Sequence, residues 1–320
     1  MLGYKVLSFS LWAVSANAAC KHRSTAPEVF VDFDGTIAAN ETILMFADAV
    51  YTATPPDKIT LPPLNPKTFN NLKKRNFLAE YQENITLAQE EYGNITTFEE
   101  EVDFAASDLR RSVDAVLYDR VASSGMIEYL TVDILEKYAS AVTIRDGWWD
   151  FALAAARRGS VPTILTNNFS IQWVRLVLRT SYQDYQSGYS NITNSTLDID
   201  EAIPIYCSEI IGTQLLPSSP TDHEFSSHSG GDKVDILHRL MIGQTKPSLY
   251  VGNSLNDLPP LVDAGAGILV GITDDVQTQL KAEGGDLRPF KQSSLPFSEG
   301  DGEVLYTAAD WNPLIPIFEK

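Results

Sequence analysis

Short apolar runs alternate with amphipathic stretches in the second half of the chain. The apolar runs predict strands at residues 161–165, 203–206, 248–251 and 268–270. The amphipathic stretches predict helices at residues 148–158, 171–179, 233–241 and 258–264. One earlier apolar run, at residues 28–31, predicts a further strand. Strands that alternate with helices are typical of an α/β protein with a doubly wound parallel sheet.

A long helical segment separates the first strand from the others. Residues 67–140 contain only Gly93 and Gly125 as helix breakers and no proline, whereas residues 52–66 are proline-rich and predict a loop. We therefore predict a core made of residues 28–37 and 142–320, with a helical cap inserted at residues 38–141. The polar stretch at residues 216–231 predicts a flexible loop.

The first twenty residues differ from the rest. An apolar run at residues 6–14 precedes the small-x-small pattern Ala16-Asn17-Ala18, which predicts a secretory signal peptide at residues 1–18. Six N-x-S/T acceptor sites, against about two expected by chance, agree with a secreted glycoprotein. They are Asn40, Asn84, Asn94, Asn168, Asn191 and Asn194. The alternative is a cytoplasmic protein with an N-terminal extension. No run is long enough for a membrane span.

Charge narrows the range of partners. Of 320 residues, 24 are basic and 42 acidic, a net charge of −18. Nucleic acid and anionic membrane surfaces are therefore poor candidates, because both are bound through clustered cations. Cys20 and Cys207 are open to pairing or to remaining free thiols. No feature of the sequence indicates an oligomeric state.

Polar motifs follow three of the predicted strands directly. The first strand ends in Asp32-Phe33-Asp34-Gly35-Thr36, the strand at 161–165 in Thr166-Asn167, and the strand at 248–251 in a segment that contains Asn253 and Asp257. Lys233 opens the preceding helix. Taken singly, these are common turn and cap residues. Because ligands bind beyond the carboxyl ends of parallel strands, their order along the chain predicts one shared site.

Together these motifs resemble the haloacid dehalogenase superfamily, and the helical insert resembles its phosphoserine phosphatase-like branch. The resemblance implies a Mg²⁺-dependent phosphatase that acts on a small phosphorylated metabolite. Asp32 would be the nucleophile and Asp34 the general acid and base. The phosphate would contact Thr166, Asn167 and Lys233, and Mg²⁺ would be bound by Asp32, Asp34, Asn253 and Asp257. A dehalogenase is disfavoured, because it does not need the acid at Asp34.

Two positions leave alternatives open. Asn253 stands where the phosphatase branch usually has a metal-binding aspartate, so the chain could instead bind a ligand with little or no turnover. Glu41 lies nine residues after Asp32, where the resemblance implies contact with a substrate amine. Its alternative is a glutamate that serves only the start of a helix.

Overall fold

The computed structural model describes residues 26–60, 77–188, 199–211, 219–225, 228–294 and 304–319. The predicted signal peptide at residues 1–18, Cys20, and the acceptor sites Asn191 and Asn194 lie outside the described residues. In the part of the chain that is described, no helix is long and apolar enough to cross a membrane.

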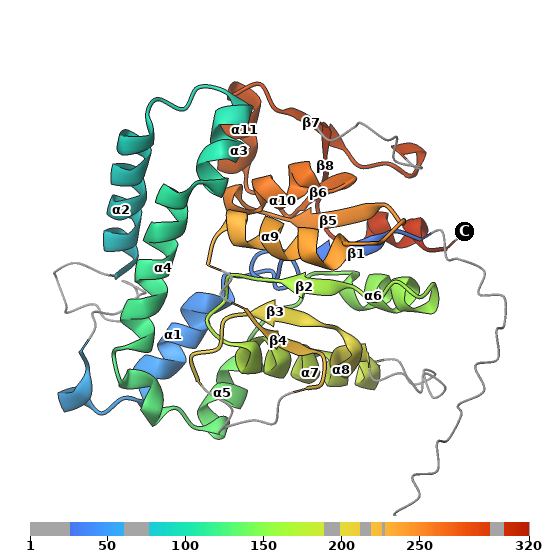
Figure 1. The fold of residues 1–320 in the computed structure, drawn as a ribbon. Coiled ribbons are helices and arrows are strands. Elements are labelled where there is room, and N and C mark those ends of the chain that lie inside the picture. The colour runs from blue at the N-terminus through green and yellow to red at the C-terminus, as the bar shows by residue number, and fades with distance from the viewer. Residues whose placement is uncertain are drawn as a thin grey trace, which may run out of the picture.

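An eight-stranded sheet forms the centre of the described part of the molecule, and every neighbouring pair of strands is parallel (Figure 1). Its order is β4-β3-β2-β1-β5-β6-β8-β7. The strands are β1 (Glu28–Val31), β2 (Thr163–Leu165), β3 (Ile205–Cys207), β4 (Asp222–Glu224), β5 (Ser248–Gly252), β6 (Ala266–Val270), β7 (Asp286–Pro289) and β8 (Val304–Ala308). Chain order reverses at β1, and the crevice beside such a reversal is where ligands bind in open α/β sheets.

Helices cover both faces of the sheet, which confirms the doubly wound α/β prediction. Alternate residues of β1 face opposite sides, with Val29 and Val31 in one buried cluster and Phe30 in the other. The first cluster includes α6 (Trp148–Arg157) and α7 (Ile171–Gly188). The second includes α9 (Gly230–Met241), α10 (Leu258–Asp263) and α11 (Asp274–Ala282).

Of the six described α-helices between β1 and β2 in the chain, the five that precede α6 stand beside the sheet (Figure 1). They are α1 (Thr42–Ala53), α2 (Phe77–Tyr92), α3 (Phe98–Ala106), α4 (Asp108–Ala122) and α5 (Val132–Ala139). We call them the helical insert. The segments that enter and leave it pair as an antiparallel bridge between Ala38 and Ile144. The five helices lie within the residues 38–141 that the sequence analysis assigns to a cap.

The remaining helical elements are short. They are α8 (Ile199–Ala202) and the 3₁₀ turns at Pro56–Lys58, Met126–Tyr129, Leu255–Asp257, Gln292–Ser294 and Asn312–Ile317.

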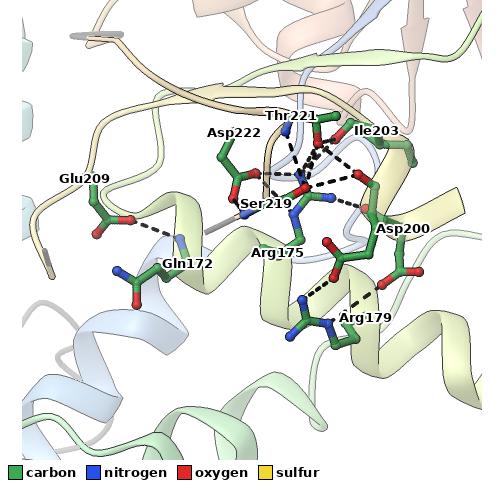
Figure 2. Close-up of polar contacts among 10 residues, drawn as sticks. Gln172, Arg175, Arg179, Asp200, Ile203, Glu209, Ser219, Thr221 and Asp222 are labelled. Carbon is green, nitrogen blue, oxygen red and sulfur yellow. Dashed lines mark hydrogen bonds and ion pairs between the residues drawn. The ribbon is translucent and has the colours of Figure 1, made fainter. Parts of the chain in front are cut away.

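The edge of the sheet corrects part of the sequence prediction. The predicted loop at residues 216–231 contains β4 and the start of α9. Buried Arg175 holds β4 by an ion pair to Asp222 of 2.5 Å, and it also donates to the Ile203 carbonyl, just before β3, at 2.9 Å (Figure 2). The sequence DHE of β4 and DLRP of β7 has no apolar alternation, because both are edge strands, and a search for apolar runs misses them.

Candidate active site

A buried ion pair joins the end of β1 to the start of α9. Asp32 directly follows β1, and Lys233 lies in the first turn of α9, whose start is fixed by a capping box between Ser229 and Asp232. Lys233 Nζ donates to Asp32 Oδ1 at 2.7 Å. Both residues are buried: Asp32 is 5% exposed and Lys233 is 2% exposed. The strand and the helix cap thus bring together two residues about 200 positions apart.

Asp257 is the third charged residue of this centre. Its Oδ1 accepts from Lys233 Nζ at 2.8 Å and from the Tyr250 hydroxyl at 3.0 Å. Its Oδ2 accepts from the Asn253 N–H, the Ser254 N–H and the Ser254 hydroxyl at 2.9 to 3.1 Å. The residue has no exposed surface. With both oxygens occupied by protein donors, Asp257 positions Lys233 and the loop after β5, and the structure gives no support to its predicted role as a metal ligand.

Electrostatics in this centre follow from burial and mutual contact. Burial raises the pKa of Asp32 well above its usual value, and the charge of Asp257 adds to the rise. Burial alone would lower the pKa of Lys233, but Asp257 and Asp32 together raise it above its usual value, so the amine stays charged. Burial also opposes ionisation of Asp257, yet Lys233 and the hydrogen bonds from the loop keep the pKa of that carboxyl low.

Asp34 connects the loop after β1 to the helical insert. Its Oδ1 accepts from the Thr42 and Ile43 N–H groups, which are the unpaired amides at the start of α1, and its Oδ2 accepts from Asn168 Nδ2 at 2.8 Å. Burial raises the pKa of Asp34, while the hydrogen bonds from Thr42 and Asn168 lower it in part. Glu41, at the cap position of the same helix, makes no capping hydrogen bond.

Asn253 packs on the turn after Asp32. Gly35 has φ of 70°, and a Cβ there would lie 1.9 Å from Asn253 Nδ2, so only glycine fits. The Thr36 hydroxyl lies 3.2 Å from Asp32 Oδ2 and 3.1 Å from Asn253 Oδ1. One hydroxyl proton serves two acceptors, so one of the two oxygens is always without it.

The residues after β2 lie against the same centre. Thr166 is buried and its hydroxyl accepts from the Asn168 N–H at 3.3 Å. Asn168 is 1% exposed, and its Nδ2 bonds to Asp34 and, at 3.1 Å, to the Thr42 hydroxyl. The side-chain nitrogen that a glycan would need is therefore engaged inside the protein, and Asn168 is not a usable acceptor site.

A cavity of about 680 Å³ opens above these residues. Seven of the eight site residues predicted from the sequence line this cavity, and the eighth, Asp257, does not. Those seven are Asp32, Asp34, Glu41, Thr166, Asn167, Lys233 and Asn253. Glu41 is exposed at this cavity, although the surrounding protein and the charges of Asp34 and Asp257 raise its pKa to about 7.

The oxygens near Asp32 fit a hard cation such as Mg²⁺. They are the Asp32 carboxylate, the Asn253 amide carbonyl and the Asp34 backbone carbonyl. The Asp32 carboxylate also accepts from Lys233, and the Thr36 hydroxyl lies near both it and the Asn253 carbonyl. The Thr36 hydroxyl has one proton for two acceptor oxygens, Asp32 Oδ2 and Asn253 Oδ1. The oxygen that does not receive this proton can contact a cation instead. Within the described ranges no three His, Cys, Asp or Glu residues are grouped to hold a metal, so the set has only one well-placed carboxylate.

Several site residues have no clear signal in the sequence. Asn168 is visible there only as a glycosylation motif, and Thr36 only as part of the turn. Tyr250 lies within a strand and gives no sign that its hydroxyl reaches Asp257. Arg110 and Asp114, on α4, line the cavity as an ion pair. Their i, i+4 spacing indicates a salt bridge but not its burial.

Comparison with known proteins identifies similar structures only. No family model and no curated protein matches the chain. A substrate-bound phosphoserine phosphatase complex is 14% identical, with a TM-score of 0.41, and the match covers 79% of this chain and 90% of that one. A phospho-aspartyl intermediate analogue of phosphoserine phosphatase is 13% identical, with a TM-score of 0.45 and coverage of 92% and 99%.

A phosphoserine phosphohydrolase-like protein from Francisella tularensis is 14% identical, with a TM-score of 0.40 and coverage of 91% and 99%. These proteins are of the kind that the motifs resemble. Identities and TM-scores this low assign neither a family nor an activity to the chain, so its function has to be inferred from its own residues.

Proposed function

We propose that the chain is a Mg²⁺-dependent phosphomonoester hydrolase of the haloacid dehalogenase type. One observation carries the proposal: the buried Asp32–Lys233 pair borders a cavity that Asp34, Thr166 and Asn167 also line. In this proposal Asp32 is the nucleophile, Lys233 the cation and Asp34 the proton carrier, and Thr166 and Asn167 are the hydrogen-bond donors. A phosphoryl group needs all four, because its transfer depends on positioning and on neutralisation of charge.

The first half-reaction transfers the phosphoryl group to the protein. The Asp32 carboxylate attacks phosphorus, a P–O bond forms, and the ester P–O bond breaks. Protonated Asp34 gives its proton to the departing alkoxide, a role favoured by the raised pKa of this buried carboxyl. Lys233 Nζ neutralises the charge of the phosphoryl oxygens, and the Thr166 hydroxyl donates a hydrogen bond to one of them.

The second half-reaction returns the protein to its starting state. Asp34, now a carboxylate, takes a proton from water, whose oxygen attacks phosphorus and breaks the bond to Asp32. Inorganic phosphate leaves. The hydrogen bonds from Thr42, Ile43 and Asn168 hold the Asp34 carboxylate in place between the two steps.

Magnesium would be held by Asp32, the Asp34 backbone carbonyl and Asn253, and when bound it supplies positive charge that neutralises the phosphate and the nucleophile. Because Asn253 brings no charge, we expect weaker metal binding than an aspartate there would give.

The substrate that this site favours is a small phosphate ester. The cavity is lined partly by the helical insert, which restricts the size of the group that can enter. In this proposal Glu41, which lines the cavity and makes no capping hydrogen bond, receives a substrate amine.

Hydrolysis of an aryl phosphate tests the proposal. We expect turnover that needs Mg²⁺, stops with EDTA and is lost in Asp32→Asn. The matched control is Asp184→Asn, on an exposed position of α7, which should keep full activity. Activity that survives Asp32→Asn would contradict the mechanism.

A second candidate is a protein that binds a phosphate ester without turning it over. Asn253 and the occupied oxygens of Asp257 favour it, because both reduce the charge available to a metal. An inactive parent together with an active Asn253→Asp variant would select this candidate.

We also propose that the chain enters the secretory pathway. Support comes from the pattern of residues 1–18 and from the acceptor sites Asn40 and Asn94, which are exposed. Expression in a eukaryotic host should give a protein whose mobility shifts on endoglycosidase treatment, less so in Asn94→Gln. An unshifted protein retained in the cytoplasm would contradict this.

A further inference from the structure

The helical insert gives the cavity an acidic wall. Glu101 on α3 and Asp114 on α4 line it, and Glu41 borders it at the start of α1. Apart from Lys233 in the reaction centre, Arg110 supplies the cationic side chain among the described residues that line it. Outside the reaction centre, three carboxylates and one guanidinium therefore line the cavity.

The charge of Arg110 is already neutralised. Its Nε lies 3.0 Å from Asp114 Oδ2, and its Nη2 donates to the Tyr81 hydroxyl at 2.8 Å. That hydroxyl in turn donates to Asp114 Oδ1 at 2.5 Å. Arg110 and Asp114 are 9% and 4% exposed, so water screens the pair little. A substrate carboxylate would have to compete with Asp114 for this guanidinium.

The other two carboxylates have no ion pair within the described residues. Glu41 is exposed at the cavity and carries a negative charge above about pH 7. Glu101 is 2% exposed, and its Oε2 accepts from the Gln279 amide at 3.4 Å. Burial and the charge of Glu283 raise the pKa of Glu101, and the charge of Arg110 lowers it in part. A carboxylate without an ion pair at the wall of a cavity favours a ligand that brings a cation. The aromatic rings of Tyr81 and Tyr118, which also line the cavity, suit an ammonium group as well.

We propose that the substrate is the phosphate monoester of an amino alcohol, with an ammonium group and no carboxylate. The inference rests on the proposed phosphatase function and adds the leaving group to it. Such a substrate puts its phosphate at Lys233 and its cation at Glu41. A phosphorylated amino acid has the same amine, but its carboxylate would meet an acidic wall in which the one arginine is already paired.

Three substrates that differ only in charge test the proposal on the full chain with Mg²⁺. They are phosphoethanolamine, phosphoserine and glycerol phosphate. We expect kcat/KM for phosphoethanolamine to exceed that of the other two at least about tenfold. Equal values, or a preference for phosphoserine, would overturn the inference while leaving an Asp32-dependent phosphatase intact.

Binding separates this inference from the proposed function. Calorimetry on Asp32→Asn measures affinity for the same three esters without turnover. Tighter binding of phosphoethanolamine than of phosphoserine supports the acidic subsite even if the parent hydrolyses nothing. Affinities that do not differ would reject the subsite whether or not the aryl phosphate is hydrolysed.

Substitution of Asp114 gives the sharpest variant test. Asp114→Asn removes the charge that neutralises Arg110, so phosphoserine should gain at least about tenfold relative to phosphoethanolamine. Asp119→Asn, an exposed change on the same helix, should leave the ratio unchanged. Glu41→Gln should lower kcat/KM for phosphoethanolamine relative to kcat/KM for glycerol phosphate. A ratio that is the same in Asp114→Asn, in a variant that remains folded by circular dichroism, would contradict the role given to the Arg110–Asp114 pair.

Discussion

Replacement of Lys233 by methionine tests whether one buried cation holds the reaction centre together. The Nζ atom contacts Asp32 Oδ1 at 2.7 Å and Asp257 Oδ1 at 2.8 Å, and the side chain is almost completely buried. Methionine is of similar length and uncharged, so the substitution removes the cation with little change in packing. It leaves two buried carboxylates with no positive charge between them.

The expected cost follows from this geometry. Removal of one partner from a buried ion pair costs about 3–5 kcal/mol. The value for Lys233→Met should lie at the lower end, because Asp32, whose pKa is already raised by burial, can bind a proton instead of remaining charged. We therefore expect a loss of about 3 kcal/mol in the free energy of unfolding. At roughly 2 °C per kcal/mol for a chain of this size, Tm falls by about 6 °C.

A double-mutant cycle measured by urea unfolding separates the ion pair from simple loss of packing. Asp257→Asn removes one of the two carboxylates, so Lys233→Met combined with Asp257→Asn should be more stable than the sum of the single effects by about 1 kcal/mol or more. Phosphatase activity should remain absent in the double variant, because no cation then neutralises the phosphate.

A surface pair provides the control. Lys246 contacts Glu28 at 2.8 Å, but both side chains are about a quarter exposed, at 24% and 29%. Lys246→Met should cost less than about 1 kcal/mol. If Lys233→Met costs no more than Lys246→Met, or if the double variant is merely additive, the reasoning about the buried centre is refuted.

Three further predictions concern residues around this centre. Asn253→Asp should bind Mg²⁺ at least about tenfold more tightly by calorimetry and show a larger Mg²⁺-induced rise in Tm than the parent; equal affinities would argue against a metal at this position. Arg145 donates to the carbonyls of Gly35 and Thr36, so Arg145→Gln should lower kcat about tenfold or more with a smaller change in KM, whereas an unchanged kcat would show that the turn holds its shape alone. Since the pKa of Glu41 is about 7, its carboxylate gains charge as pH rises, and KM for phosphoethanolamine should fall between about pH 6 and about pH 8. In Glu41→Gln, KM for phosphoethanolamine should depend on pH in the same way as KM for glycerol phosphate.

The fold was predictable where its signals are local. The buried strands β1, β5 and β6 appear as apolar runs, and the helical insert as a long segment almost free of helix breakers, because burial on both faces and helix propensity act over short stretches of chain. The strands β4, β7 and β8 were not predicted. An edge strand such as β4 or β7 gains its partner from the tertiary structure and needs no apolar pattern of its own, whereas β8 lies between β6 and β7.

The candidate site also has one part that the sequence predicted and one part that it did not. Asp32, Asp34, Thr166 and Asn253 were predictable because each directly follows a strand, and parallel strands bring their carboxyl ends to one edge. The direction in which each of these side chains points was not predictable from the sequence. The sequence suggested Asp257 as a metal ligand, whereas packing against Tyr250 and the loop after β5 occupies both its oxygens.

By itself, then, the sequence determined the α/β class, the place of the helical insert and the residues that meet at the end of the sheet, since all of these follow from periodicity and chain order. Only the tertiary structure decided which charges are neutralised. Asp34 accepts the amides of α1, Asp257 holds Lys233, and Asp114 pairs with Arg110. The first two of these contacts join segments that are distant in the chain or that meet only after a turn. All three lie where water is largely excluded, so their electrostatic effect depends on burial that no local pattern encodes.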